Sequence, residues 1–153
     1  MPSEVSKKVP FDLQNFTPYL LNQAAEATSR GFEAYYRSKY GMLRSEWRVV
    51  FHLGHYGELT AKDICVRARI HKTKISRAVQ ALENKRFLLR KERAEDRRHE
   101  DLLLTAAGHR VFDDLSREAQ RFDATLLEGF SLAQREQLRR FLRTLAERHA
   151  SKR

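Results

Sequence analysis

Apolar residues recur at every third or fourth position along much of the chain, which is the spacing of amphipathic helices. One run leads from Phe16 to Tyr35 by steps of three and four and predicts a helix of about five turns that ends near Gly41. The next run predicts a helix over Ser45–His55, and the sequence Gly54–Gly57 predicts a turn after it. The first third of the chain is therefore expected to hold two helices.

The centre of the chain carries two shorter helical patterns. Thr60 and Asp63 have the spacing of a capping box and predict the start of a short helix. Apolar residues from Ile75 to Leu82 share one face of a second helix, predicted over Lys72–Lys85. Two helices separated by so few residues indicate a helix-turn-helix pair.

A β-hairpin is expected after that pair. Two β-patterned runs, Phe87–Lys91 and Asp101–Leu104, flank a very polar stretch. Residues 92–100 between them include no apolar residue larger than alanine. They are therefore expected to form a hairpin tip that projects into solvent.

Two longer helices are expected to follow the hairpin. Thr105 can cap the first of them, whose apolar run of helical spacing ends near Gly129. Ser131 and Gln134 form a second capping box, which opens a last helix.

This order of elements predicts a mainly α fold with a small β-hairpin wing. A short helix, a turn, a second helix and a charged hairpin are the parts of a winged helix-turn-helix, assigned to a DNA-binding lobe at 42–104. The helices at 16–41 and 105–149 carry more apolar surface than that small lobe can cover, so they are assigned to a helical dimerisation lobe. Residues 1–15 are expected to be a leader, and all 153 residues a single domain.

The distribution of charge narrows the choice of partner. The chain has 30 Lys and Arg against 20 Asp and Glu, and residues 60–100 alone hold 13 against 6. The positive charge thus belongs to the helix-turn-helix and hairpin, which favours nucleic acid over a membrane surface or an acidic protein. No apolar run approaches the ~18 residues that cross a bilayer, and there is no secretory core. A cytoplasmic protein without a membrane partner is expected.

The second helix of the pair is the expected reader of DNA. At 100° per residue its apolar side chains form one stripe, and the opposite face carries side chains that hydrogen-bond to base edges or phosphates. Two lysines stand in its first turn, where the helix dipole disfavours cations, and this placement suits a docked phosphate. The expected contacts on this helix are Lys72, Thr73, Lys74, Ser76, Arg77 and Gln80.

The hairpin tip supplies further expected DNA contacts, namely Asp96, Arg97, Arg98 and His99. Its arginines can reach phosphates or a narrow minor groove, whose potential attracts arginine. Asp96 is a poor DNA contact by itself and is expected to pair with and orient an arginine. The alternative is an ordinary solvated loop of charged residues.

Three runs together resemble the MarR family of transcription regulators. Asp96–Gly108 (DRRHEDLLLTAAG) is similar to the family's wing, Ser45–Val50 (SEWRVV) to its second helix, and Ile75–Glu83 (ISRAVQALE) to its recognition helix. Leu43, His71 and Arg86 depart from the family pattern, because the first two stand where capping side chains are common and Arg86 replaces a glycine.

The resemblance implies a homodimer, joined through the first and last two helices, that binds a pseudo-palindromic, inverted-repeat operator in double-stranded DNA. It implies repression or activation of transcription, of which repression is the expected role. It also implies a small effector, often aromatic and acidic, bound between the dimerisation helices and the DNA-binding lobe. The candidate effector residues are Tyr36, Phe51, His52 and His55.

Other kinds of site receive less support from the residues. No metal and no cofactor are expected, because no cysteine or carboxylate with ligand spacing joins His52 and His55. Cys65 is the sole cysteine and is expected to be a small core residue rather than a redox switch.

The sequence gives less support to two other functional classes. The chain lacks nucleotide-binding and nucleophile motifs, so an enzyme is not expected. A winged-helix DNA-binding or architectural protein without a ligand remains the alternative. The outward face of the recognition helix carries no aromatic residue for stacking on RNA bases, which argues against an RNA reader.

Overall fold

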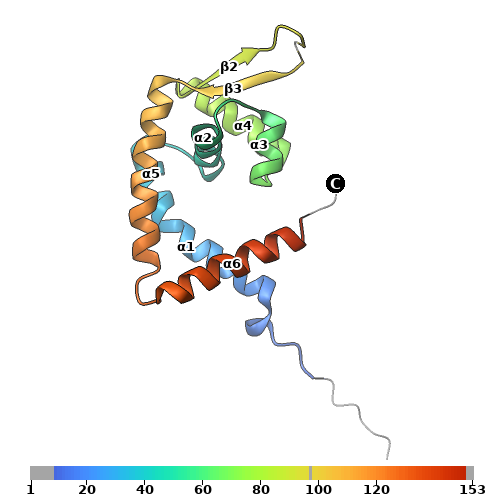
Figure 1. Cartoon of the computed structure of the whole chain (residues 1–153), viewed down its shortest axis with the longest axis vertical. Helices are drawn as coiled ribbons and strands as arrows, with labels where there is room; N and C mark the ends of the chain where they lie inside the picture. The colour runs from blue at the N-terminus through green and yellow to red at the C-terminus, as the bar shows by residue number, and fades with distance from the viewer. Residues whose placement is uncertain (1–8, 97, 151–153) are drawn as a thin grey trace, which may run out of the picture.

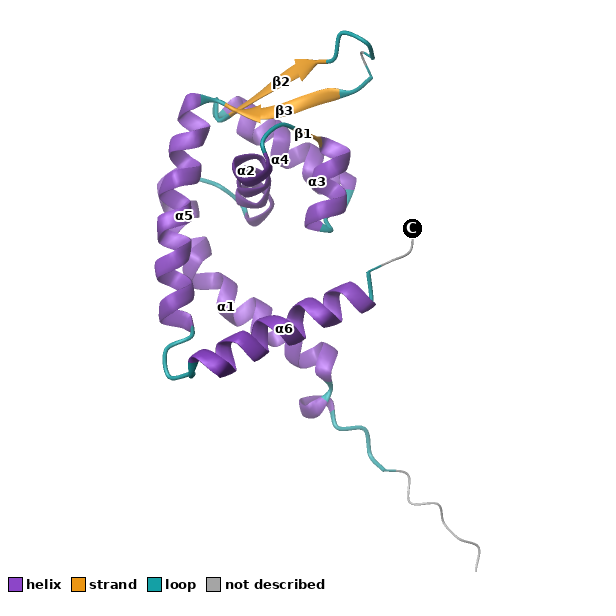
Figure 2. Cartoon of the chain, in the orientation of Figure 1, coloured by secondary structure: helices purple, strands orange, loops and turns teal. Residues whose placement is uncertain are grey.

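A computed structural model describes residues 9–96 and 98–150 of the chain. Within these ranges the protein consists of six α-helices, one 3-10 turn and one small sheet (Figure 2). In chain order these are η1 (Leu13–Asn15), α1 (Thr17–Tyr40), α2 (Arg44–Tyr56), β1 (Leu59–Thr60), α3 (Ala61–Ala68), α4 (Lys72–Asn84), β2 (Leu88–Glu92), β3 (Glu100–Leu104), α5 (Ala106–Leu126) and α6 (Leu132–Arg148). The predicted mainly α fold with a small β wing is confirmed.

The sheet is antiparallel and has the strand order β1-β3-β2. β2 and β3 form the predicted hairpin, in which Leu88 lies opposite Leu104. β1 pairs Leu59 with Leu102 and was not predicted, because two residues are too few to show an alternating pattern.

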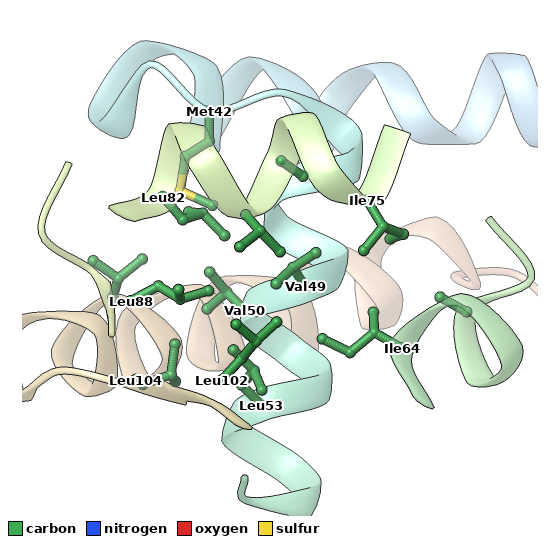
Figure 3. Close-up of a cluster of buried hydrophobic side chains, with 14 of the residues drawn as sticks. Met42, Val49, Val50, Leu53, Ile64, Ile75, Leu82, Leu88, Leu102 and Leu104 are labelled. Carbon is green, nitrogen blue, oxygen red and sulfur yellow. The ribbon is translucent and has the colours of Figure 1, made fainter. Parts of the chain in front are cut away.

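Helix α2 runs through the centre of the winged helix-turn-helix lobe (Figure 3). Its Val49, Val50 and Leu53 are at most 2% exposed. Apolar side chains from α3, α4 and the sheet converge on this helix, among them Ile64, Ile75, Leu82, Leu88 and Leu102. Each contributes about 1.5–3 kcal/mol by leaving water, so this core holds α4 and the wing in place.

The predicted capping residues begin three of the helices. The hydroxyl oxygens of Thr60, Thr105 and Ser131 each accept a hydrogen bond from the backbone N–H three residues later, at 3.0–3.1 Å. His71 acts as the cap of α4 through its ring, since Nδ1 accepts from the Thr73 N–H at 3.2 Å. Leu43 has no capping oxygen, and its own N–H donates to the Glu46 carboxylate at 2.7 Å.

Arg86 ends α4 with a left-handed backbone, at φ 62°. Its N–H donates to the Glu83 carbonyl oxygen at 2.9 Å, and the Phe87 N–H donates to that of Leu82 at 3.0 Å. These two bonds make a Schellman motif, which glycine usually closes. The Thr105 hydroxyl also donates to the Arg86 carbonyl oxygen, at 2.7 Å. The connection from α4 to the wing is therefore built at a local cost of roughly 1 kcal/mol.

Helices α1, α5 and α6 form the other part of the molecule (Figure 1). α5 leads from the wing to α6 and packs on α1, where the rings of Phe32 and Phe122 stack at 6.0 Å between centroids. α6 has no buried residue, and its Phe141 is 62% exposed. Among the residues that the structure describes, no helix is both long and apolar enough to cross a membrane.

Candidate nucleic-acid interface

Helix α4 packs its predicted apolar stripe on α2 and turns a polar face outward. Ile75, Ala78, Val79 and Leu82 are at most 2% exposed, as the helical spacing predicts. The six expected contacts on this helix, Lys72, Thr73, Lys74, Ser76, Arg77 and Gln80, are all exposed. The first turn contains no acidic residue, so the positive end of the helix dipole and two lysines face solvent together.

The turn between α3 and α4 is held by an arginine of α2. The Arg48 guanidinium donates to the Ala68 carbonyl oxygen at 2.6 Å, which satisfies an acceptor at the end of α3. Burial, with a smaller effect from the nearby Arg44, lowers the pKa of Arg48. Arg69 then takes a left-handed backbone, φ 54°, and directs the chain into α4.

The wing tip is organised by Asp96 through the backbone. Its Oδ1 accepts from the Arg98 N–H at 3.0 Å, and its Oδ2 lies 3.5 Å from His99 Nε2. The expected pairing of Asp96 with an arginine side chain is therefore replaced, for Arg98, by a bond to the main chain. The aspartate side chain is short, so its carboxylate reaches the backbone N–H two residues later more readily than a guanidinium. Arg97, another expected contact, lies outside the described residues.

A cleft of about 430 Å³ brings the outward face of α4 together with the wing. Ser76 and Gln80 line it on the side of the helix, and Arg98 and His99 line it on the side of the tip. Lys72, Thr73, Lys74 and Arg77 lie on the exposed surface of α4 outside this cleft.

The cleft also contains Lys62 and Arg90, which the sequence analysis did not single out. Lys62 belongs to α3, and Arg90 belongs to β2, where alternation along the strand could have marked it as facing α4. The Arg90 guanidinium donates to Glu83 of α4 at 2.9 Å, to Glu100 of β3 at 3.3 Å and to Gln80 at 3.3 Å. Arg90 therefore joins the wing to α4.

Three of the four candidate effector residues share a groove between α2 and α5. Phe51, His52 and His55 line this space of about 540 Å³ together with Tyr56, Phe112, Ser116, Ala119, Gln120 and Asp123. His52 Nδ1 lies 2.6 Å from the Arg48 carbonyl oxygen. Because that oxygen can only accept, Nδ1 carries a proton and Nε2 of a neutral ring is an acceptor.

Tyr36 does not join this groove. It is 1% exposed and lines a neighbouring space of about 340 Å³ between α1, α2 and α5. Phe51, Ala119 and Asp123 border both spaces. The sequence placed these aromatic residues on the correct helices, but side-chain packing divides them.

Cys65 is partly buried against the core, as expected. Burial raises the pKa of its thiol, which is opposite to the change that makes a cysteine reactive. Among the described residues, no cluster of three or more His, Cys, Asp or Glu side chains is placed to hold a metal ion.

The known sequences that resemble this chain are those of transcriptional regulators. Residues 40–99, which include the helix-turn-helix and the wing strand β2, match the MarR family. The chain is 24% identical over 91 residues to an uncharacterized HTH-type transcriptional regulator, YwoH, from Bacillus subtilis (strain 168). That match covers 60% of this chain and 66%, just under two thirds, of the relative.

Solved structures match nearly the whole chain. A MarR/EmrR family transcriptional regulator from Acinetobacter sp. ADP1 is 25% identical, with a TM-score of 0.81 over 90% of this chain and 97% of the other. BpsR from Bordetella bronchiseptica, whose DNA binding is regulated by 6-hydroxynicotinic acid, has a TM-score of 0.82 at 18% identity, over 90% and 97% of the two chains. A protein from Listeria monocytogenes, described as a MarR family regulator and solved with a 26mer DNA, has a TM-score of 0.79 at 18% identity, over 92% and 90%.

Proposed function

We propose that this protein, which belongs to the MarR family of winged-helix transcriptional regulators, is a repressor that binds an inverted-repeat operator as a homodimer. The observation that carries the proposal is the cleft in which Gln80 of the recognition helix faces Arg98 of the wing. A major groove is wide enough for α4, while a wing beside it reaches the adjacent backbone or minor groove.

The exposed residues of α4 divide into two roles in this proposal. Lys72, Thr73 and Lys74, at the start of the helix, bind phosphates, since two cations and a hydroxyl stand in the turn where the helix dipole is positive. Arg77 and Gln80 lie further along the outward face and read base edges. At the tip, Arg98 and His99 bind the DNA backbone, and Arg97 is assigned there from the sequence alone.

The unpartnered apolar surface of the helical lobe supports the homodimer. Large apolar side chains remain exposed at the start of α1, at the end of α5 and along α6: Phe16, Leu20, Leu21, Leu126, Phe130, Leu132, Leu138, Phe141 and Leu142. Many large apolar side chains left exposed on the helices of one lobe are typical of a protein–protein interface. Two copies related by a twofold axis would present two recognition helices, so half-site centres about one helical turn (~10 bp) apart, or a multiple of it, are expected.

The groove between α2 and α5 is the proposed effector site. Its walls combine the rings of Phe51 and Phe112 with the imidazoles of His52 and His55, a lining that suits a flat molecule with a polar or acidic group. The solved relative BpsR responds to an aromatic acid, 6-hydroxynicotinic acid, and we propose the same chemical class here. The alternative is a DNA-binding protein that no small molecule controls.

Selection of bound sequences from random DNA, followed by anisotropy titrations, tests the proposal. An inverted repeat should be recovered, and light scattering at micromolar concentration should report twice 18.0 kDa. Unpaired half-sites or an 18.0 kDa particle would contradict it. Adding 6-hydroxynicotinic acid and nicotinic acid should then weaken operator binding in the native protein and not in His52→Leu. An unchanged affinity with a panel of aromatic acids would favour the ligand-independent alternative.

A further inference from the structure

The side-chain amide of Gln80 is held from both ends in the free protein. Arg90 Nη2 lies 3.3 Å from Gln80 Oε1, and Gln80 Nε2 lies 3.0 Å from Asn84 Oδ1. A guanidinium has only donors, so the atom of the amide that faces it must be the oxygen. The identity of the neighbour therefore decides which way the amide points, a choice that an isolated glutamine leaves open.

Arg90 is itself fixed by two carboxylates. Its Nε donates to Glu83 Oε2 on α4 at 2.9 Å, and its Nη1 donates to Glu100 Oε2 on β3 at 3.3 Å. The three acceptors lie on two different elements, and only a planar side chain with several N–H groups can serve them together. Because two carboxylates already neutralise its charge, Arg90 is poorly suited to binding a phosphate.

The hydrogen-bonding groups of the Gln80 amide that are not used by Arg90 and Asn84 determine which base edge it can bind. One lone pair of Oε1 and one N–H of Nε2 are left after the bonds to Arg90 and Asn84. An acceptor beside a donor matches adenine, which offers its N6 amino group and N7 along the major-groove edge. Guanine offers two acceptors there, and its O6 would oppose the oxygen of the amide.

We propose that Arg90 is a positioning residue that orients the Gln80 amide so that Gln80 reads an adenine in each half-site. This inference rests on the proposed function, because it requires α4 to enter the major groove. It adds a wing residue that selects a base without touching DNA, and it names the base. Preorganisation of the amide before binding removes the need to order it in the complex.

Arg90→Lys is the informative substitution, because it keeps the charge and removes the fork that holds three acceptors. After the operator is found by selection, affinities are measured for full-length protein on all four bases at each half-site position. The native protein should prefer adenine at one position by about five- to 150-fold, the range for a good bidentate contact. Gln80→Ala and Arg90→Lys should each reduce that preference at least fivefold at the same position, and the double variant no further than Gln80→Ala alone.

Three further measurements distinguish a loss of amide orientation from a general structural defect. Arg90→Lys should retain the native melting temperature, the affinity for scrambled DNA and the salt dependence of binding. Arg93→Lys is the matched control, because Arg93 is also a wing arginine but pairs with Asp101, at 2.9 Å. It should leave the adenine preference intact.

Four outcomes would overturn the inference. The first is that Arg90→Lys keeps the preference for adenine, and the second is that the position relaxed by Gln80→Ala prefers another base. The third is that Arg93→Lys loses the adenine preference as much as Arg90→Lys does. The fourth is that Arg90→Lys loses the preference and also binds scrambled DNA more weakly. In each of these the protein still selects an operator, so the proposed function stands. Only a native protein without any sequence preference would reject the proposed function itself.

Discussion

The ammonium group of Lys85 lies 2.5 Å from the carboxylate of Glu46, whose side chain is 2% exposed. The other oxygen of this carboxylate accepts the Leu43 N–H at 2.7 Å. The end of α4 is thereby joined to the start of α2, and both oxygens of the buried carboxylate have a partner.

Lys85→Met should destabilise the protein by about 2–4 kcal/mol, because it leaves the buried Glu46 carboxylate without a counter-charge. Urea unfolding at pH 7 measures the change. Lys91→Met is the control, because Lys91 is exposed and its ion pair with Glu58 is long, at 3.9 Å. This substitution should change the free energy of unfolding by less than about 0.5 kcal/mol. Equal effects of the two substitutions would show that the Glu46 pair contributes nothing.

Arg86→Gly should stabilise the protein by about 1 kcal/mol and raise the melting temperature by several degrees. The reason is the left-handed backbone of Arg86, φ 62°, which glycine adopts without steric cost. Arg110→Gly, at an exposed position inside α5, should have the opposite sign, because glycine there only loosens a helix. A lower melting temperature for Arg86→Gly would mean that the Arg86 side chain contributes more than its strained backbone costs.

The free energy of unfolding should depend on pH through the ionisation of Asp114. Its carboxylate accepts hydrogen bonds from the hydroxyls of Tyr35 and Tyr40 and lies 3.0 Å from the Lys39 ammonium. Burial by itself would raise the pKa of Asp114, but these three partners lower it below the ordinary 3.8. A lowered pKa means that the stabilisation is present above pH ~4 and is lost as the pH falls through the folded-state value.

Asp114→Asn should therefore cost about 1–2 kcal/mol at pH 7 and less at pH 3. Denaturant unfolding of both proteins at the two pH values gives the difference. Asp113→Asn, at the adjacent exposed position of α5, should show no such pH-dependent difference. If the cost of Asp114→Asn is the same at both pH values, the hydrogen bonds do not depend on the charge.

Arg98→Ala should weaken binding to operator and to scrambled DNA alike, because the wing tip binds backbone charge and reads no base in the proposed complex. With two wings in a dimer, the slope of log K against log[salt] should fall by about two. Arg121→Ala on α5, whose side chain is 76% exposed and far along the chain from the wing, should change neither quantity. An unchanged slope for Arg98→Ala would identify residues 92–100 as a solvated loop.

Asp96→Ala should produce a milder loss of the same kind. Its carboxylate accepts the Arg98 N–H at 3.0 Å, so removing it loosens the turn that presents Arg98. Asp96→Asn keeps an acceptor and should retain most of the affinity. A salt titration of the three proteins distinguishes a loosened turn, which asparagine rescues, from a role of the carboxylate charge.

Local patterns were sufficient to predict the helices and the hairpin of this protein, although not strand β1. Helical spacing gave the buried stripe of α4, including Ile75 and Leu82, because both faces of one helix are set by residues within a few positions of each other. Thr60, Thr105 and Ser131 were identifiable as caps for the same reason. The charge of residues 60–100 and the polar outward face of α4 were also properties of adjacent residues, and they indicated DNA as the partner.

Contacts between distant residues required the folded chain. Arg90 is ten residues from both Gln80 and Glu100, and no periodicity within one element places its guanidinium between them. The division of Tyr36 and His52 between two spaces depends on how α1, α2 and α5 pack together. The sequence by itself determined which side chains face outward, since that follows from backbone geometry over a few residues. Only the tertiary structure decided which of those side chains meet, because that depends on how the separate elements pack around α2.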